Sequence, residues 1–143
     1  MLLRNIIYNL HVKSTPLHLE LGRLGEKLAA DYLIQKGFTI VCTNFRVKGG
    51  EIDIIAEKMD HLHFVEVKTV SCENIDDTSN SGFRPEDNIH NWKIKRLKMA
   101  INLYLISKGK GNFDLPWQFD VITLKIDSNS KKARINFIKD IIL

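Results

Sequence analysis

The sequence is poor in the residues and patterns on which several classes of protein depend. Its 143 residues include only two cysteines, Cys42 and Cys72, which form no zinc-ligand spacing and are too few for a disulfide framework. No stretch approaches the roughly 20 apolar residues needed to cross a bilayer. The apolar opening, MLLRNIIYNL, lacks the basic start and the small-residue cleavage site of a signal peptide. We therefore expect free thiols and a soluble, cytoplasmic protein with no membrane partner.

Internal repeats, a glycine-rich phosphate loop and signs of a second domain are also missing from the sequence. A chain of 143 residues with 44% hydrophobic content suits one globular domain with its own core. The formal net charge is +4, but residues 71–90 hold five acidic residues against one arginine, so that the remainder of the chain carries +8. A basic body suits a polyanionic partner such as nucleic acid, and ordinary solubilising charge is the alternative.

Hydrophobic periodicity predicts a single α/β domain over residues 1–143. Apolar residues recur every three or four positions in two segments, which predicts helices, and alternate at period two in five others, which predicts strands. Gly37 follows the first helix, as a C-cap glycine does. The expected order is α-β-β-β-α-β-β around a central mixed sheet flanked by helices. The predicted segments are a loosely attached arm at 1–16, helices at 17–36 and 91–107, strands at 38–47, 51–56, 62–68, 117–126 and 134–142, and a flexible acidic loop at 71–91.

The stretch 49–69, GGEIDIIAEKMDHLHFVEVKT, is predicted to form a hairpin of two strands. If Lys58 pairs with His61, the register is defined, and facing residues then have Cβ atoms roughly 5 Å apart. This register sets three pairs opposite each other: Ile55 with Phe64, Asp53 with Glu66, and Glu51 with Lys68.

Two carboxylates therefore face each other in the predicted hairpin. Asp53 and Glu66 repel at such a separation, and Glu66 interrupts the apolar run FVEVK. A divalent cation removes the repulsion, and Mg²⁺ is usually held by one or two carboxylates together with water and substrate phosphate. Lys68 projects on the same side as Glu66, where it can orient a metal-bound water or stabilise charge on a phosphate. The alternative is a solvated hairpin face on which these residues form only ion pairs.

Basic residues outside the hairpin are candidates for contact with nucleic acid. Lys93 and Arg96 lie in the first two turns of the helix predicted at 91–107, where cations oppose the helix dipole. Such a conflict is expected where a phosphate or an acidic site is the intended partner. Arg46 is a third candidate, with a solvated strand-end charge as its alternative. Trp92 is predicted to be a buried anchor, with base stacking as the alternative.

Three motifs together resemble a known family. Asp53, followed after twelve residues by Glu66-Val67-Lys68, is similar to the core motif of the PD-(D/E)xK nuclease superfamily, which includes restriction endonucleases and archaeal Holliday-junction resolvases. The longer set consists of Gly25-Glu26 in the first helix, GEID at 50–53 and FVEVKT at 64–69. With this set, the chain resembles the YraN-like family of small bacterial proteins over roughly residues 19–124.

The resemblance implies a restriction-endonuclease-like sandwich and metal-dependent hydrolysis of phosphodiester bonds in DNA or another nucleic acid. Asp53 and Glu66 would ligate Mg²⁺ or Mn²⁺, and Lys68 would position the attacking water. Glu26 would be an auxiliary ligand or base, with a helix-surface glutamate as the alternative, and Glu51 is a weaker candidate.

Two observations keep other functions open. The family usually has arginine at the positions of Gln118 and Val70, so two cations that would favour phosphate binding are missing. A non-catalytic nucleic-acid-binding or adaptor protein with the nuclease fold is therefore the alternative to an enzyme, and a structural ion-pair hairpin in a protein–protein module is a third interpretation. The oligomeric state stays open, a homodimer included.

Overall fold

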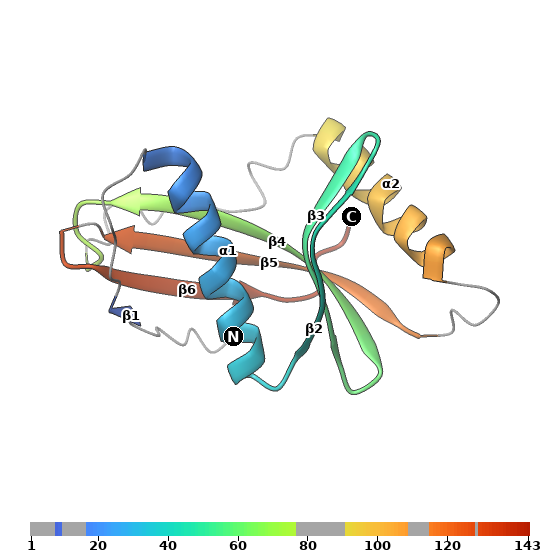
Figure 1. The fold of residues 1–143 in the computed structure, drawn as a ribbon, viewed down its shortest axis with the longest axis horizontal. Coiled ribbons are helices and arrows are strands. Elements are labelled where there is room, and N and C mark those ends of the chain that lie inside the picture. The colour runs from blue at the N-terminus through green and yellow to red at the C-terminus, as the bar shows by residue number, and fades with distance from the viewer. Residues whose placement is uncertain (1–7, 10–16, 77–90, 109–114, 128) are drawn as a thin grey trace.

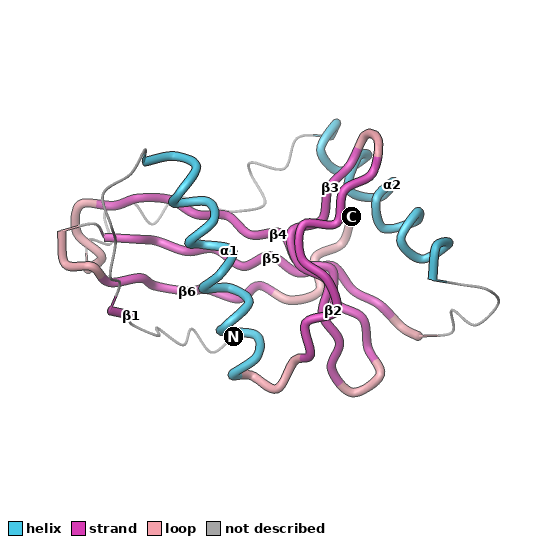
Figure 2. Tube along the Cα trace, viewed as in Figure 1, coloured by secondary structure: helices cyan, strands magenta, loops and turns pink. Residues whose placement is uncertain are grey.

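The computed structural model describes residues 8–9, 17–76, 91–108, 115–127 and 129–143. Within these residues one mixed sheet has the strand order β1-β6-β5-β4-β3-β2, and β4 and β5 are its parallel pair (Figures 1 and 2). The predicted α/β class and the order α-β-β-β-α-β-β are confirmed, with a two-residue strand added ahead of them. The elements are β1 (Tyr8–Asn9), α1 (Leu17–Gln35), β2 (Thr39–Val47), β3 (Gly50–Lys58), β4 (His61–Cys72), α2 (Asn91–Lys108), β5 (Trp117–Asp127) and β6 (Lys132–Ile138).

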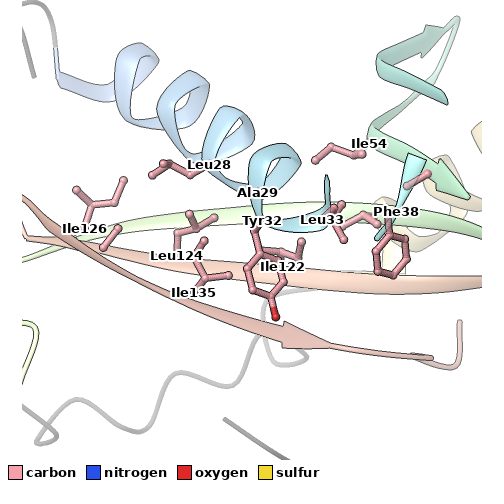
Figure 3. Packing of buried hydrophobic residues seen from close by; sticks show 13 residues of the cluster. Leu28, Ala29, Tyr32, Leu33, Phe38, Ile54, Ile122, Leu124, Ile126 and Ile135 are labelled. Carbon is pink, nitrogen blue, oxygen red and sulfur yellow. The ribbon is translucent and has the colours of Figure 1, made fainter. Parts of the chain in front are cut away.

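The two helices cover opposite faces of the sheet. Alternate residues of a strand point to opposite faces, and along β5 Ile122 belongs to the α1 layer while Val121 belongs to the α2 layer. The α1 layer buries an aliphatic cluster with two aromatic rings at its edge, and Figure 3 shows the helix lying over it. The alternation predicted for 117–126 is therefore confirmed, and the result is a sandwich of helix, sheet and helix.

The end of α1 follows directly from its sequence. Gly37 has a φ of +86°, a conformation that costs glycine least. Its N–H donates to the Ile34 carbonyl, and the Phe38 N–H donates to the Leu33 carbonyl at 3.0 Å. These are the paired bonds of a Schellman cap, so the predicted C-cap is confirmed.

One of two glycines in α1 lies where the helix approaches the sheet. A Cβ on Gly25 would come within 1.8 Å of the Thr69 Oγ1 on β4, so only glycine allows this contact. Gly22 has no such neighbour within 4 Å. The close approach of α1 to β4 therefore requires glycine at Gly25 and not at Gly22.

β2 does not alternate as predicted. Phe38 and Ile40 pack in the α1 layer, but Cys42 packs with Phe45 in the α2 layer. The pairing of β2 with β3 shifts between Ile40 and Cys42, because a bulge inserts an extra residue there. Cys42 therefore lies on the opposite face from Phe38 and Ile40, and the strict alternation predicted for 38–47 is wrong at the bulge.

The register predicted for the β3–β4 hairpin is confirmed as far as the ladder extends. Lys58 pairs with His61 and Ile55 with Phe64. The ladder ends one step later, at Ile54. Beyond it, β3 turns away from β4 toward the start of α2 (Figure 1). The strands therefore separate before the predicted pairs of Asp53 with Glu66 and of Glu51 with Lys68, and neither pair belongs to the ladder. Glu51 faces Arg46 of β2 instead.

Several boundaries differ from the prediction because distant segments supply the partners. β4 continues to Cys72, since β5 pairs with it in parallel along its whole length. β6 ends at Ile138, since the chain then turns back to bond β5 through the N–H groups of Asp140 and Ile141. Trp92 is 58% exposed, so its predicted burial is wrong.

Part of the predicted organisation lies outside the described residues. This applies to most of the arm at 1–16 and to residues 77–90 of the acidic loop. Neither α1 nor α2, the helices of the described part of the chain, is long and apolar enough to cross a membrane.

Candidate active site

Asp53 and Glu66 line the same cleft, at the point where β3 leaves β4. The cleft has a volume of about 250 Å³ and lies beside the start of α2. Where the ladder stops, the Asp53 side chain replaces it, because its Oδ2 accepts a hydrogen bond from the Val67 N–H at 2.7 Å. Glu66 is only 8% exposed. The lining residues are Glu51, Asp53, Glu66, Trp92, Lys93, Arg96 and Leu97.

The surroundings of Asp53 favour the protonated form of its carboxyl group. Burial, and next the charge of Glu66, raise the pKa of Asp53 from 3.8 to about 7. The Val67 N–H opposes this shift, whereas the charge of Glu26 and hydrogen bonding with Glu66 reinforce it. The Asp53 carboxylate therefore takes up a proton near neutral pH, well above the usual range of an aspartate.

Two lysines meet Glu66. The Lys93 ammonium, from α2, donates a short hydrogen bond to the Glu66 Oε1, and the Lys68 Nζ lies 3.8 Å from the same oxygen. Burial and the neighbouring Lys93 lower the pKa of Lys68. Burial acts in the same direction on Lys93, but the bond to Glu66 and the charges of Glu66 and Asp53 outweigh it and raise the pKa of Lys93. Lys93 is therefore the firmly charged partner of Glu66, and Lys68 is the more easily deprotonated one.

Glu26 and Lys68 line a second pocket, under α1, with a volume of about 520 Å³. The contact of Lys68 with Glu66 joins this pocket to the cleft. Glu26 is also close enough for its charge to raise the pKa of Asp53. The predicted catalytic residues thus come from β3, β4 and α1. They lie in the cleft and in the adjoining pocket, on the two sides of the junction at which β3 leaves β4.

The metal-binding capacity of this junction rests on two carboxylates. Among the described residues, no group of three or more His, Cys, Asp or Glu side chains gathers as a metal site. Asp53 and Glu66 are the residues that could hold a cation, since carboxylate oxygens are the hard donors that Mg²⁺ takes. Glu51 lines the same cleft but pairs with Arg46, with 3.3 Å between Nε and Oε1.

The three predicted nucleic-acid contacts all have partners within the protein. Lys93 is bonded to Glu66. The Arg96 Nε donates to the Gly49 carbonyl at 2.8 Å, and its guanidinium lies 5.7 Å from the Trp92 ring centre. Arg46 pairs with Glu51 while remaining 72% exposed. The acidic site considered for the cations of α2 is therefore Glu66, which is 27 residues from Lys93 in sequence.

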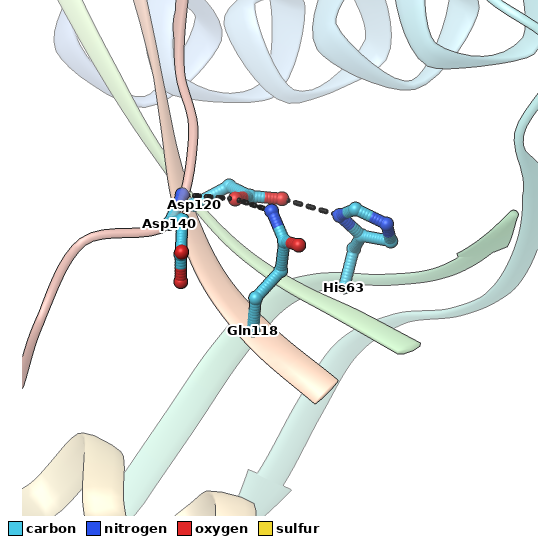
Figure 4. Close-up of polar contacts among 4 residues, drawn as sticks. All are labelled: His63, Gln118, Asp120 and Asp140. Carbon is cyan, nitrogen blue, oxygen red and sulfur yellow. Dashed lines mark hydrogen bonds and ion pairs between the residues drawn. The ribbon is translucent and has the colours of Figure 1, made fainter. Parts of the chain in front are cut away.

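A buried polar network on the other face of β4 and β5 was missed in the sequence. The His63 Nδ1 and the Asp120 Oδ2 are 2.6 Å apart (Figure 4). The other oxygen of Asp120, which is fully buried, accepts hydrogen bonds from the Gln118 Nε2 at 2.7 Å and from the Asp140 N–H at 2.8 Å. The available signal was the presence of a polar side chain, His63 or Asp120, in each of two otherwise apolar strands.

This network explains the position of Gln118, which stands where the family usually has arginine. Gln118 bonds to Asp120, in the network beside β6, and does not line the cleft of Asp53 and Glu66. An arginine at that position would not face the carboxylate pair. Val70, in contrast, lines the pocket of Glu26 and Lys68, so the loss of a cation there affects the candidate site.

Comparison with known proteins identifies one family. The family model described as "Uncharacterised protein family UPF0102" matches residues 25–124. Curated UPF0102 proteins are similar over most of both chains. One from Hahella chejuensis is 39% identical over 112 residues, or 78% of this chain and 83% of its own. One from Campylobacter fetus is 38% identical over 120 residues, or 84% and 91%, and one from Caldicellulosiruptor bescii is 38% identical over 122 residues, or 85% and 95%.

Proposed function

This chain belongs to the uncharacterised protein family UPF0102, the YraN-like family that its motifs resemble, and on that premise we propose that it hydrolyses phosphodiester bonds of nucleic acid with a divalent metal ion. The observation that carries the proposal is that the buried Glu66 and the half-buried Asp53 line one cleft, where burial and the charge of Glu66 raise the pKa of Asp53 to about 7. Such a pair is costly to a protein that has no cation to place there.

Mg²⁺ or Mn²⁺ fits this pair on chemical grounds. Asp53 and Glu66 would hold the ion through carboxylate oxygens, and Mg²⁺ sites commonly use one or two carboxylates together with substrate phosphate. When bound, the ion lowers the pKa of a coordinated water and offsets charge on the phosphate. The 250 Å³ cleft beside the pair leaves room for a phosphate group and water.

Lys68 and Glu26 supply the remaining chemistry. Lys68 lies 3.8 Å from Glu66, so it can orient a water beside the carboxylate pair and offset charge on the phosphate. Its lowered pKa brings it closer to exchanging a proton at neutral pH, as a general acid or base must. Glu26 lines the same pocket as Lys68 and acts as the auxiliary acid–base group.

One observation favours the alternative of a non-catalytic nucleic-acid-binding or adaptor protein. The Lys93 ammonium already neutralises Glu66 without a metal. A fold kept only for binding would need no further cation at this junction.

Metal-dependent stabilisation separates the two functions. In thermal and urea melts, saturating Mn²⁺ should stabilise the wild type, by about 2.7 kcal/mol at 100 times the Kd. Asp53→Asn and Glu66→Gln should lose this stabilisation, together with Mn²⁺-dependent nicking of supercoiled plasmid. Asp31→Asn, which changes an exposed carboxylate of α1, is the matched control and should keep both. A wild type that binds nucleic acid but gains no stability from Mn²⁺ and cuts nothing would establish the adaptor function instead.

A further inference from the structure

A basic pocket lies at the end of α1, away from the carboxylate cleft. It has a volume of about 230 Å³ and is lined by three lysines and three aromatic rings from different segments. Lys36 follows α1, Lys58 ends β3 and Lys139 follows β6. The rings are those of Tyr32, Phe38 and Phe137, and Figure 3 shows Tyr32 and Phe38 extending from the end of α1 toward the same side.

Each lysine lies over one of these rings. The distances from Nζ to the ring centre are 5.5 Å for Lys36 over Tyr32, 5.0 Å for Lys58 over Phe38 and 5.2 Å for Lys139 over Phe137. Phe137 in turn contacts Tyr32 and Phe38 edge-on, with centres 6.1 and 6.0 Å apart. The rings therefore form one cluster that holds three ammonium groups around a shared opening.

The positive charge of this pocket has no partner in the described part of the chain. No acidic side chain lines the pocket, and none of the three lysines joins an ion pair among the described residues. The Lys58 Nζ also donates to the Lys36 carbonyl at 2.6 Å, which holds it at the negative end of α1 without neutralising it. Three like charges that converge on aromatic faces leave a site that is complementary to an anion.

From this geometry we infer that Lys36, Lys58 and Lys139 bind phosphate groups of a nucleic-acid backbone. The choice of nucleic acid as the source of the phosphates rests on the proposed function, whereas the binding does not require hydrolysis. Lysine binds phosphate as a point charge. Arg46, Lys93 and Arg96, in contrast, are engaged with partners inside the protein.

Lys36 follows the last residue of α1, whereas Glu26 and the pocket that it shares with Lys68 lie nearer the beginning of the same helix. A nucleic-acid backbone held by the three lysines therefore has the pocket of Glu26 and Lys68 along the same helix.

Salt-dependent binding tests this inference. Fluorescence anisotropy of a labelled duplex of about 20 base pairs would be followed against KCl concentration, in EDTA to exclude metal-dependent hydrolysis. Each phosphate contact contributes about 0.9 to the slope of log Kobs against log salt. The triple change Lys36→Gln, Lys58→Gln and Lys139→Gln should therefore flatten the slope by up to about 2.7 units. The double change that keeps Lys58 should flatten it by up to about 1.8 units and leaves the bond to the Lys36 carbonyl intact.

The matched control removes three exposed lysines elsewhere, by Lys27→Gln, Lys95→Gln and Lys131→Gln, with the same loss of charge. An equal change of slope in the control and the pocket variant would overturn the inference, because only net charge would then matter. Because duplex binding is measured in EDTA, without hydrolysis, a failed nicking assay does not affect the interpretation of this result. A wild type that binds no duplex, but whose melting temperature rises with pyrophosphate through the same three lysines, would overturn the assignment to nucleic acid.

Discussion

Replacing Asp53 by asparagine should make the protein more stable at neutral pH and change how its stability depends on pH. The substitution keeps an oxygen to accept the Val67 N–H and adds an amide N–H₂ that can donate to Glu66. It removes the group whose pKa burial and Glu66 raise to about 7. In the wild type, this carboxylate lowers the unfolding free energy only when it is ionised.

The structure sets the sign and the ceiling of the effect. Because the folded-state pKa lies above the unfolded value of 3.8, the stabilising contribution of the protonated Asp53 is complete below pH 3.8 and is lost as the pH rises through about 7. At about 1.4 kcal/mol per pKa unit, the interval from 3.8 to about 7 corresponds to at most about 4 kcal/mol. Asp53 is only half-buried, and solvent screens part of its interaction with Glu66, so the measured loss should lie below this ceiling.

Urea denaturation from about pH 4 to pH 8, in EDTA, measures the effect as the difference in unfolding free energy between Asp53→Asn and the wild type. This difference should grow by up to about 4 kcal/mol in favour of the variant as the pH rises. Taking the difference cancels the carboxylates that lie far from Asp53, since their surroundings are the same in both proteins. Asp31→Asn reports the effect of losing one exposed carboxylate.

Parallel curves of unfolding free energy against pH for Asp53→Asn and the wild type would refute this reasoning. Neither burial nor the charge of Glu66 would then oppose the ionisation of Asp53. A variant that is less stable than the wild type at every pH would show instead that Asp53 acts as a structural ion pair.

Two further predictions concern the framework that holds the site. Gly25→Ala should destabilise the protein, because its Cβ would meet the Thr69 Oγ1 at 1.8 Å, whereas Gly22→Ala has open space and should gain up to about 1 kcal/mol from helix propensity. Urea denaturation of the two variants measures the contrast. Asp120→Ala should cost about 3–5 kcal/mol, since it leaves His63 and a backbone N–H without their buried partner. Thermal and urea melts of this variant measure the loss.

Equal stabilities of the two glycine variants would show that α1 can shift away from β4 at little cost. A loss below about 1 kcal/mol for Asp120→Ala would mean that water replaces the buried carboxylate, contrary to the burial seen in the structure.

Elements governed by contacts within a few residues were predictable from the sequence. The apolar periodicity of α1 and its cap at Gly37 depend on neighbours within one or two turns. The alternation of β5 between the two layers is likewise a property of its own residues. The register of the β3–β4 hairpin followed from a short turn, because the turn defines which residues face each other.

Elements governed by distant partners were not predictable in the same way. The bulge in β2 moves Cys42 to the α2 layer, and the alternating residues of 38–47 contain no sequence signal that predicts this bulge. β4 continues to Cys72 because β5, which begins 45 residues later, pairs with it. The exposure of Trp92 likewise depends on how the start of α2 sits over the cleft.

The sequence by itself placed Asp53 and Glu66 on the two strands of one hairpin, and Lys68 on the same face as Glu66. The reason is that side chains alternate along a strand. Only the tertiary structure decided that β3 leaves β4 just before this pair, and that Lys93 reaches Glu66. The structure alone also brought together the lysines at 36, 58 and 139. The physical reason is that strand periodicity acts along the chain, whereas the convergence of charges depends on how helices pack on a twisted, splitting sheet.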